Sequence, residues 1–148
     1  MRKILFLDID GVLAGFDWFR NREHGADFLD PSLVQKLNQL GCDIVISSSW
    51  GDNGGKTAEQ LRCKGLTLPI VGYTEHWEIG HDWIVRGNSI RKWLCDNMKD
   101  TDYQYAIADD DRDMLLEQAG HFVRIDPETG VTDGNIEEIN HILNSGIL

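Results

Sequence analysis

Acidic side chains cluster at two places where an apolar run of the sequence ends. Asp8 and Asp10 follow the run 4–7, and at a spacing of two they point to the same side of an extended chain. Four further acids lie within Asp109–Asp113, directly after the run 103–108. Like charges held together are costly unless a cation or a shared proton relieves them, and Mg²⁺ prefers such carboxylates together with waters. The two clusters therefore predict a Mg²⁺ site, although a single Asp that opens a helix also serves as an N-cap.

Hydroxyl and basic side chains near the other predicted strand ends could bind the oxygens of a phosphoryl group. Three serines stand at the end of the apolar run 43–47: Ser47, Ser48 and Ser49. A hydroxyl there can donate to a phosphoryl oxygen, and a cation must neutralise the charge of the transferred group. The candidate cations are Arg86, Lys56, Arg91 and Lys92. Arg86 is favoured because it lies just before an expected helix, from which it could reach the strand ends.

The elements that must position these groups alternate between short apolar runs and helical patterns, which is typical of βαβ units around a parallel sheet. We expect strands over residues 3–7, 43–47, 68–71, 103–108 and 121–125. Helices are expected over 31–40, with Asp30 as N-cap, and over 57–64, 88–98, 111–119 and 136–143. In such sheets ligands bind beyond the carboxyl ends of the strands, so the acids, the serines and Arg86 are predicted to meet at one edge.

Composition limits the kind of protein. The chain has 148 residues, 25 acidic against 14 basic, and a formal net charge of −11. This fits one α/β domain over 1–148 and argues against a generic duplex-DNA binder or a protein that lies on an anionic membrane. No apolar run approaches the roughly 18 residues of a membrane span. Three cysteines without CxxC spacing indicate neither a disulfide framework nor a zinc site, so we expect a cytoplasmic protein without a disulfide partner.

Several motifs, taken in order, resemble a known family over nearly the whole chain. They are Asp8-Ile-Asp10-Gly11-Val-Leu, Ser48-Ser49-Trp50, Arg86 followed by Ile90 and Trp93-Leu94, Ile107-Ala-Asp109-Asp110-Asp111, and Asp126-Pro-Glu-Thr-Gly130-Val-Thr. This order resembles the haloacid dehalogenase-like (HAD) phosphohydrolases, and most closely the small HAD domain of the "Swiss Army Knife" RNA repair proteins. The resemblance implies a Rossmann-like three-layer sandwich with a five-stranded parallel sheet in the order 5-4-1-2-3. One departure is Arg86, because most HAD enzymes have Lys there.

The resemblance also implies a reaction. The protein would be a phosphoric monoester hydrolase, a Mg²⁺-dependent phosphatase that passes through an aspartyl-phosphate. Asp8 would be the nucleophile, and Asp10 would act first as general acid and then as base. Ser48 and Arg86 would hold the phosphoryl oxygens, with Ser47 as the alternative to Ser48.

The same resemblance implies the ligands of the metal. Mg²⁺ would be held by the carboxylates of Asp8 and Asp109 and by the main-chain carbonyl of Asp10. Asp110, or alternatively Asp113, would fix the waters of the metal from a second layer of contacts.

The insertions between the motifs bear on the substrate. The flap 12–29 and the stretch 51–85 are too short for a folded cap domain, so we expect a capless enzyme whose open site accepts a phosphate monoester such as a nucleotide or a nucleic-acid end. The flap interleaves aromatic and basic residues, which suits stacking on a nucleotide as well as simple packing against the body. The expected substrate contacts are Gly11, Ser47, Ser49, Arg20 and Arg22.

Two other readings of the sequence stay open. Gly55-Lys56-Thr57 follows an apolar strand and precedes a helix, as in a P-loop nucleotidase, but the spacing of the first glycine is one residue short. A non-catalytic receiver-like module would also gather acids and Mg²⁺ at strand ends. It would place its acceptor Asp on a later strand, and here the second strand ends in serines.

Overall fold

Five parallel strands form the centre of the computed structural model, which describes residues 1–21, 27–76, 78–79, 82–83 and 85–145. The strands are β1 (Arg2–Leu7), β2 (Asp43–Ile46), β3 (Ile70–Tyr73), β6 (Tyr103–Asp109) and β7 (Phe122–Arg124). The α-helices are α1 (Phe16–Arg20), α2 (Pro31–Lys36), α3 (Lys56–Cys63), α4 (Arg86–Asn97) and α5 (Asp133–Asn144). The 3₁₀ segments of the described residues are η2 (Leu37–Gln39), η3 (Asn53–Gly55) and η4 (Leu116–His121). The two-residue strands β4 (Glu78–Ile79) and β5 (Asp82–Trp83) make a separate antiparallel pair.

The order of the strands in the sheet is β3-β2-β1-β6-β7, which confirms the predicted order when it is read from the other edge. Leu7 at the end of β1 lies opposite Ile46 of β2 and Ala108 of β6. The residues that follow these three positions are therefore brought to one edge of the sheet. The central strands are apolar and buried on both faces, as expected for a sheet covered by helices on both sides.

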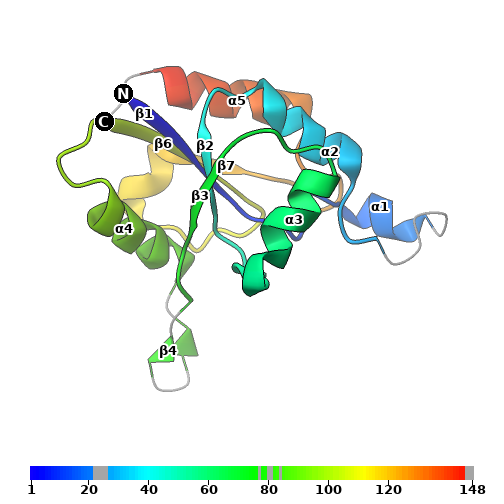
Figure 1. Cartoon of the computed structure of the whole chain (residues 1–148), viewed down its shortest axis with the longest axis horizontal. Coiled ribbons are helices and arrows are strands. Elements are labelled where there is room, and N and C mark those ends of the chain that lie inside the picture. The colour runs from blue at the N-terminus through cyan, green and yellow to red at the C-terminus, as the bar shows by residue number, and fades with distance from the viewer. Residues whose placement is uncertain (22–26, 77, 80–81, 84, 146–148) are drawn as a thin grey trace.

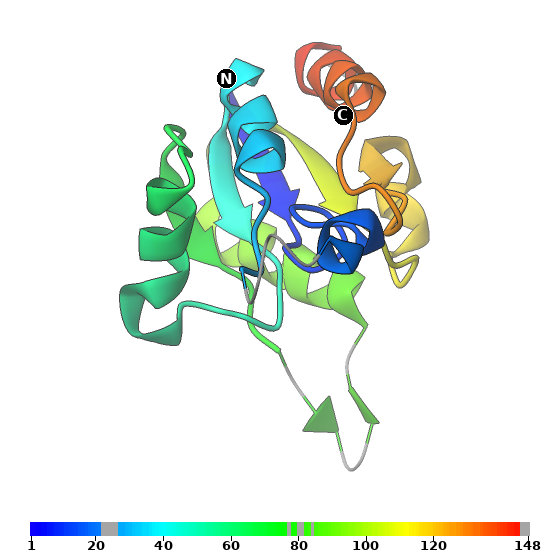
Figure 2. The same cartoon turned by 90° about the vertical axis from the view of Figure 1, so that its right-hand side faces the viewer.

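Helices cover both faces of the sheet, so the fold is the expected three-layer α/β arrangement (Figures 1 and 2). One core joins alternate residues of the strands to the apolar faces of α2, α3 and α5. The second core lies under α4 and contains Phe6, Val45 and Ile107 from the strands and Ile90 and Leu94 from the helix. Because side chains alternate between faces along a strand, the core to which a residue belongs also tells which way its neighbours point.

The helix predicted over 111–119 is wrong. The chain is irregular over 110–115, and only the 3₁₀ segment η4 follows. The acids at this position use their side chains in local turns and contacts instead of continuing a helix: the Asp109 carboxylate accepts from the Asp111 amide at 2.9 Å. Gln118 accepts from the Leu115 amide at 2.8 Å and donates to the carbonyl of Gly87 at 2.8 Å. Gln118 thus ties this segment to the start of α4.

The remaining differences are small. The flap expected as a loop contains the short helix α1, and the stretch between β3 and α4 contains the β4–β5 pair, which projects from the body in both views (Figures 1 and 2). The three cysteines are free: Cys42 is buried, whereas Cys63 and Cys95 are exposed. Among the described helices, none has the length and apolar character needed to cross a bilayer.

Candidate active site

Four polar side chains stand in a row across the carboxyl ends of neighbouring strands. The amides of Asp8, Ser47 and Thr74 each donate to a carbonyl of the adjacent strand at 2.8–3.0 Å, which continues the parallel ladder one residue beyond the strands. For each of these residues, and for Asp109 at the end of β6, the residue two positions earlier in the chain lies on the side of the sheet that faces α4. The row therefore runs Thr74, Ser47, Asp8, Asp109 on the face of the sheet that α4 covers.

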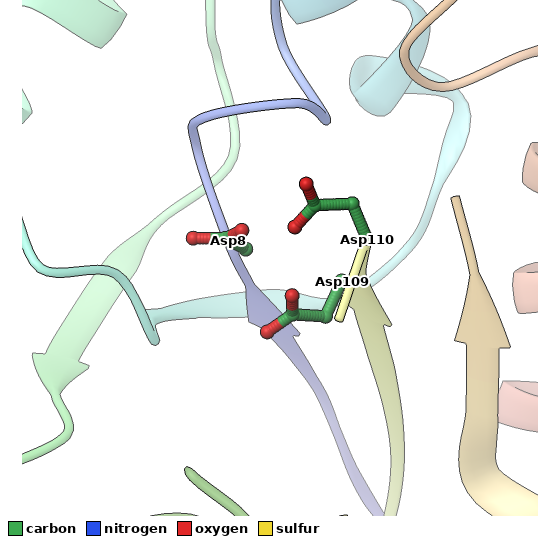
Figure 3. Close-up of side chains that lie close together, drawn as sticks. All are labelled: Asp8, Asp109 and Asp110. Carbon is green, nitrogen blue, oxygen red and sulfur yellow. The ribbon is translucent and has the colours of Figure 1, made fainter. Parts of the chain in front are cut away.

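Three carboxylates converge at one end of this row. Ligand oxygens of Asp8, Asp109 and Asp110 all lie within 4.8 Å of one another, the first from the end of β1 and the other two from the end of β6 (Figure 3). Asp8 is 5% exposed and Asp109 1% exposed. Gly11 makes room for Asp110, because a Cβ at this glycine would lie 2.4 Å from Asp110 Oδ2, and its φ of +77° also favours glycine. This all-oxygen set can hold a hard divalent cation.

Arg86 lies directly on two of these carboxylates. Its Nη1 is 3.1 Å from Asp8 Oδ1 and 2.7 Å from Asp109 Oδ2. Burial and the neighbouring Asp109 raise the pKa of Asp8 far above its ordinary value, and Arg86 offsets only part of this effect. Burial also raises the pKa of Asp109, against the opposing effect of Arg86. Burial would lower the pKa of Arg86, but the carboxylates around it outweigh burial and raise it.

Hydrogen bonds to Asp113 hold the start of α4, where Arg86 lies. The Arg86 amide donates to Asp113 Oδ2 and the Gly87 amide to the Asp113 carbonyl, both at 3.0 Å. Gly87 has no room for a side chain, because a Cβ would lie 2.6 Å from the Leu115 amide nitrogen. Asp113 thus caps α4, whereas Asp110, the other acid considered for the metal site, lies in the carboxylate cluster. The second carboxylate oxygen of Asp113, Oδ1, is buried without a partner.

The three serines differ in what their side chains do. The hydroxyl of Ser47 is buried and has no hydrogen-bond partner. The hydroxyl of Ser48 accepts from the Trp50 amide at 3.2 Å, so it belongs to a local turn. Ser49 is exposed. Thr74, which no sequence motif singles out, resembles Ser47 in having a buried hydroxyl without a partner.

Asp10 lies outside the buried carboxylate cluster. Its side chain is exposed, and its Oδ1 accepts a hydrogen bond of 3.2 Å from the indole Nε1 of Trp50. No pattern in the sequence links these two residues, which are 40 positions apart.

Of the two arginines expected to bind substrate, the structure describes one, Arg20. Arg20, at the end of α1, makes an exposed ion pair with Glu128, and Arg22 lies outside the described residues. Phe16 and Phe19 of the same flap are about half exposed, at 53% and 47%. Lys56, the cation of the P-loop reading, is exposed at the start of α3.

Comparison with known proteins decides the family. A model of the family described as "HAD domain in Swiss Army Knife RNA repair proteins" matches residues 4–136. The chain belongs to this family. The match covers all five strands of the sheet from Ile4 onward and every carboxylate of the cluster. Neither a search of curated proteins nor a search of solved structures finds a match.

Membership of the HAD family points to phosphohydrolase-type chemistry on a phosphorylated substrate, in the context of RNA repair. HAD domains generally use Mg²⁺, and the buried acidic cluster is the group of side chains in the described part of this chain that suits such an ion.

Proposed function

We propose that this protein is a Mg²⁺-dependent phosphatase that transfers the phosphoryl group of a phosphate monoester to Asp8 and then to water. The observation that carries the proposal is the contact of Arg86 with Asp8 and Asp109 inside a buried carboxylate cluster. A nucleophile, a place for a metal and a cation for the phosphoryl oxygens are thereby within reach of one another. The membership of the HAD family supports the same chemistry.

Asp8 and Asp10 divide the chemical work. A carboxylate oxygen of Asp8 attacks phosphorus, the bond from phosphorus to the leaving oxygen breaks, and an aspartyl-phosphate forms at position 8. Asp10 gives its proton to the leaving oxygen in this step. In the second step Asp10 takes a proton from the water that attacks the phosphoaspartate, which releases inorganic phosphate and restores the Asp8 carboxylate. Arg86 donates to phosphoryl oxygens while charge moves between the attacking and leaving oxygens.

The residues at the carboxylate cluster fit Mg²⁺. The cluster offers only oxygen atoms, two of its three carboxylates are buried, and Gly11 leaves space for the third. Asp8, Asp109 and the main-chain carbonyl of Asp10 would hold the ion, with Asp110 fixing its waters. Bound there, the ion supplies positive charge next to the phosphoryl oxygens.

Ser47 is the better candidate for the hydroxyl that binds the phosphoryl group. It stands beside Asp8 in the row of strand ends, and its buried hydroxyl has no partner in the free protein. A buried hydroxyl without a partner is unfavourable by about 1–3 kcal/mol, and a phosphoryl oxygen would relieve this. Ser48, in contrast, already accepts from the Trp50 amide. We therefore assign to Ser47 the role that the sequence favoured for Ser48.

The family context and the short insertions support a proposal for the substrate class. We propose a phosphate at the end of a nucleotide or nucleic acid, because the family is named for RNA repair proteins. The exposed Phe16 and Phe19 on the flap are side chains on which a base can stack. Arg20 would have to exchange its ion pair with Glu128 for a phosphate.

The experiment is hydrolysis of a generic aryl phosphate by the purified protein, with and without Mg²⁺. We expect turnover that requires the metal and is lost in Asp8→Asn. Asp111→Asn is the matched control, because Asp111 is an exposed acid of the same segment that lies outside the cluster. Activity that survives in Asp8→Asn would rule out Asp8 as the nucleophile. A panel of 3′- and 5′-phosphorylated oligonucleotides, mononucleotides and sugar phosphates would then identify the substrate class.

A further inference from the structure

The exposed side chain of Asp10 has a hydrogen bond from a distant residue. Its Oδ1 accepts from Trp50 Nε1 at 3.2 Å, across 40 positions of the sequence. Asp10 is the residue that the proposed reaction needs as proton donor. An exposed carboxyl group rotates freely unless something holds it, and proton transfer requires it within hydrogen-bond reach of the leaving oxygen.

Contacts of both its ring and its backbone hold Trp50 in place. Its ring is partly buried and packs against the core that includes α2, α3 and α5. Its amide donates to Ser48 Oγ at 3.2 Å, and the Gly51 amide donates to the Ser48 carbonyl at 3.0 Å. The turn 48–51 therefore presents the indole N–H from a fixed position.

We propose that Trp50 is a positioning residue that orients the Asp10 carboxyl group for proton transfer to the leaving oxygen. This inference rests on the proposed function. Because the indole N–H donates to Oδ1, Oδ1 acts as the acceptor oxygen of the carboxyl group. The proton that is transferred is then carried by Oδ2. As the bond from phosphorus to the leaving oxygen breaks, the Oδ2 proton passes to that oxygen, and Asp10 is left as a carboxylate whose Oδ1 keeps its hydrogen bond.

The test compares two aryl phosphates that differ in how much they need a proton donor. 4-Nitrophenyl phosphate releases a stable phenolate, whereas phenyl phosphate releases a more basic oxygen that needs protonation. The quantity measured is kcat/KM, because it reports the steps up to formation of the phosphoaspartate and excludes its hydrolysis. Trp50→Phe keeps an aromatic ring but removes the N–H. Trp93→Phe is the matched control, because Trp93 packs on Phe6 in the core under α4.

Trp50→Phe is expected to lower kcat/KM for phenyl phosphate about tenfold, which is the usual effect of losing one ordering hydrogen bond, and to lower that for 4-nitrophenyl phosphate by a much smaller factor. Trp93→Phe is expected to leave the ratio of the two substrates unchanged. In an Asp10→Ala background, adding Trp50→Phe is expected to have no further effect on phenyl phosphate. The proposal would be overturned if Trp50→Phe lowered kcat/KM equally for both substrates, or lowered it for neither. It would also be overturned if Trp50→Phe lowered kcat/KM for phenyl phosphate by the same factor in the Asp10→Ala background as in the wild-type protein.

A second measurement does not depend on activity. The indole N–H resonance of Trp50, assigned through its absence in Trp50→Phe, is expected to move in Asp10→Ala and to stay in place in Asp111→Ala. An unmoved resonance would overturn the contact, and with it the proposal. If the resonance moves but the wild-type protein hydrolyses neither ester, the proposed function fails and so does the role in proton transfer, while the hydrogen bond itself stands.

Discussion

Replacing the proposed nucleophile is expected to make the metal-free protein more stable. Asp8 is almost fully buried beside Asp109, and Arg86 is shared between the two carboxylates. Burial and the charge of Asp109 raise the pKa of Asp8 from 3.8 to about 9. Asp8→Asn keeps the shape and an acceptor oxygen for Arg86, but it removes a carboxyl group that folding must either bury as a charge or protonate. The free energy of unfolding should therefore rise.

The size of the effect depends on pH, with a definite sign. A carboxyl group whose pKa is raised by folding takes up a proton on folding, so the wild-type protein loses stability as pH rises from 3.8 towards 9. Each pH unit in that window corresponds to about 1.4 kcal/mol, which sets an upper limit of about 4.5 kcal/mol at pH 7. The amide must also be accommodated, so we expect a gain of about 2 kcal/mol, or roughly 4–8 °C in Tm. The gain should shrink as pH falls towards 5.

The assay is thermal or urea unfolding of the wild-type protein and Asp8→Asn, with a chelator and with excess Mg²⁺, at several pH values. Mg²⁺ at a hundredfold excess over its Kd should stabilise the wild-type protein by about 2.7 kcal/mol and should stabilise Asp8→Asn far less. The difference in the free energy of unfolding between the two proteins should therefore disappear or change sign. Asp111→Asn should follow the wild-type protein. If Asp8→Asn is less stable than wild type in chelator, or gains as much from Mg²⁺, the description of this cluster as a metal site built from unfavourably buried carboxyl groups is refuted.

Three further substitutions probe the neighbouring groups. Arg86→Ala should destabilise the metal-free protein by about 3 kcal/mol, because it removes the cation that contacts two buried carboxyl groups, and Arg86→Lys should recover part of this in urea unfolding. Gly11→Ala should weaken Mg²⁺ binding in calorimetry, because its Cβ would meet Asp110 Oδ2 at 2.4 Å, and an unchanged Kd would contradict this. Ser47→Ala should raise the inhibition constant for inorganic phosphate about tenfold, the usual effect of losing one hydrogen bond to a charged group; Ser48→Ala should alter it little, and the reverse order would return the role to Ser48.

The sheet could be predicted from the sequence because its strands are short, apolar and buried on both faces. Runs such as 4–7 and 103–108 carry this signal without help from the rest of the chain. The meeting of Asp8 and Asp109 at one edge then follows from parallel topology, because strand ends of the same polarity lie together. Both expectations depend on local pattern and chain direction alone.

What the sequence could not predict depends on contacts between distant segments. The acids after β6 favour a helix start by composition, but Asp113 caps α4 instead and no α-helix forms there. The difference between Ser47 and Ser48 is one residue of register, which decides the face of the sheet to which a side chain points. The contact between Trp50 and Asp10 joins two loops after different strands, and no periodicity encodes such a pairing.

The most direct test of the central claim is chemical trapping of the intermediate. The protein is mixed with a phosphate monoester and Mg²⁺, quenched in acid and reduced with borohydride, which converts a phosphorylated aspartate to homoserine. Peptide mass spectrometry then locates the modified residue. We predict homoserine at position 8, dependent on substrate and Mg²⁺ and absent in Asp8→Asn. Turnover without any modification of Asp8, or modification at another residue, would contradict an aspartyl-phosphate mechanism through Asp8.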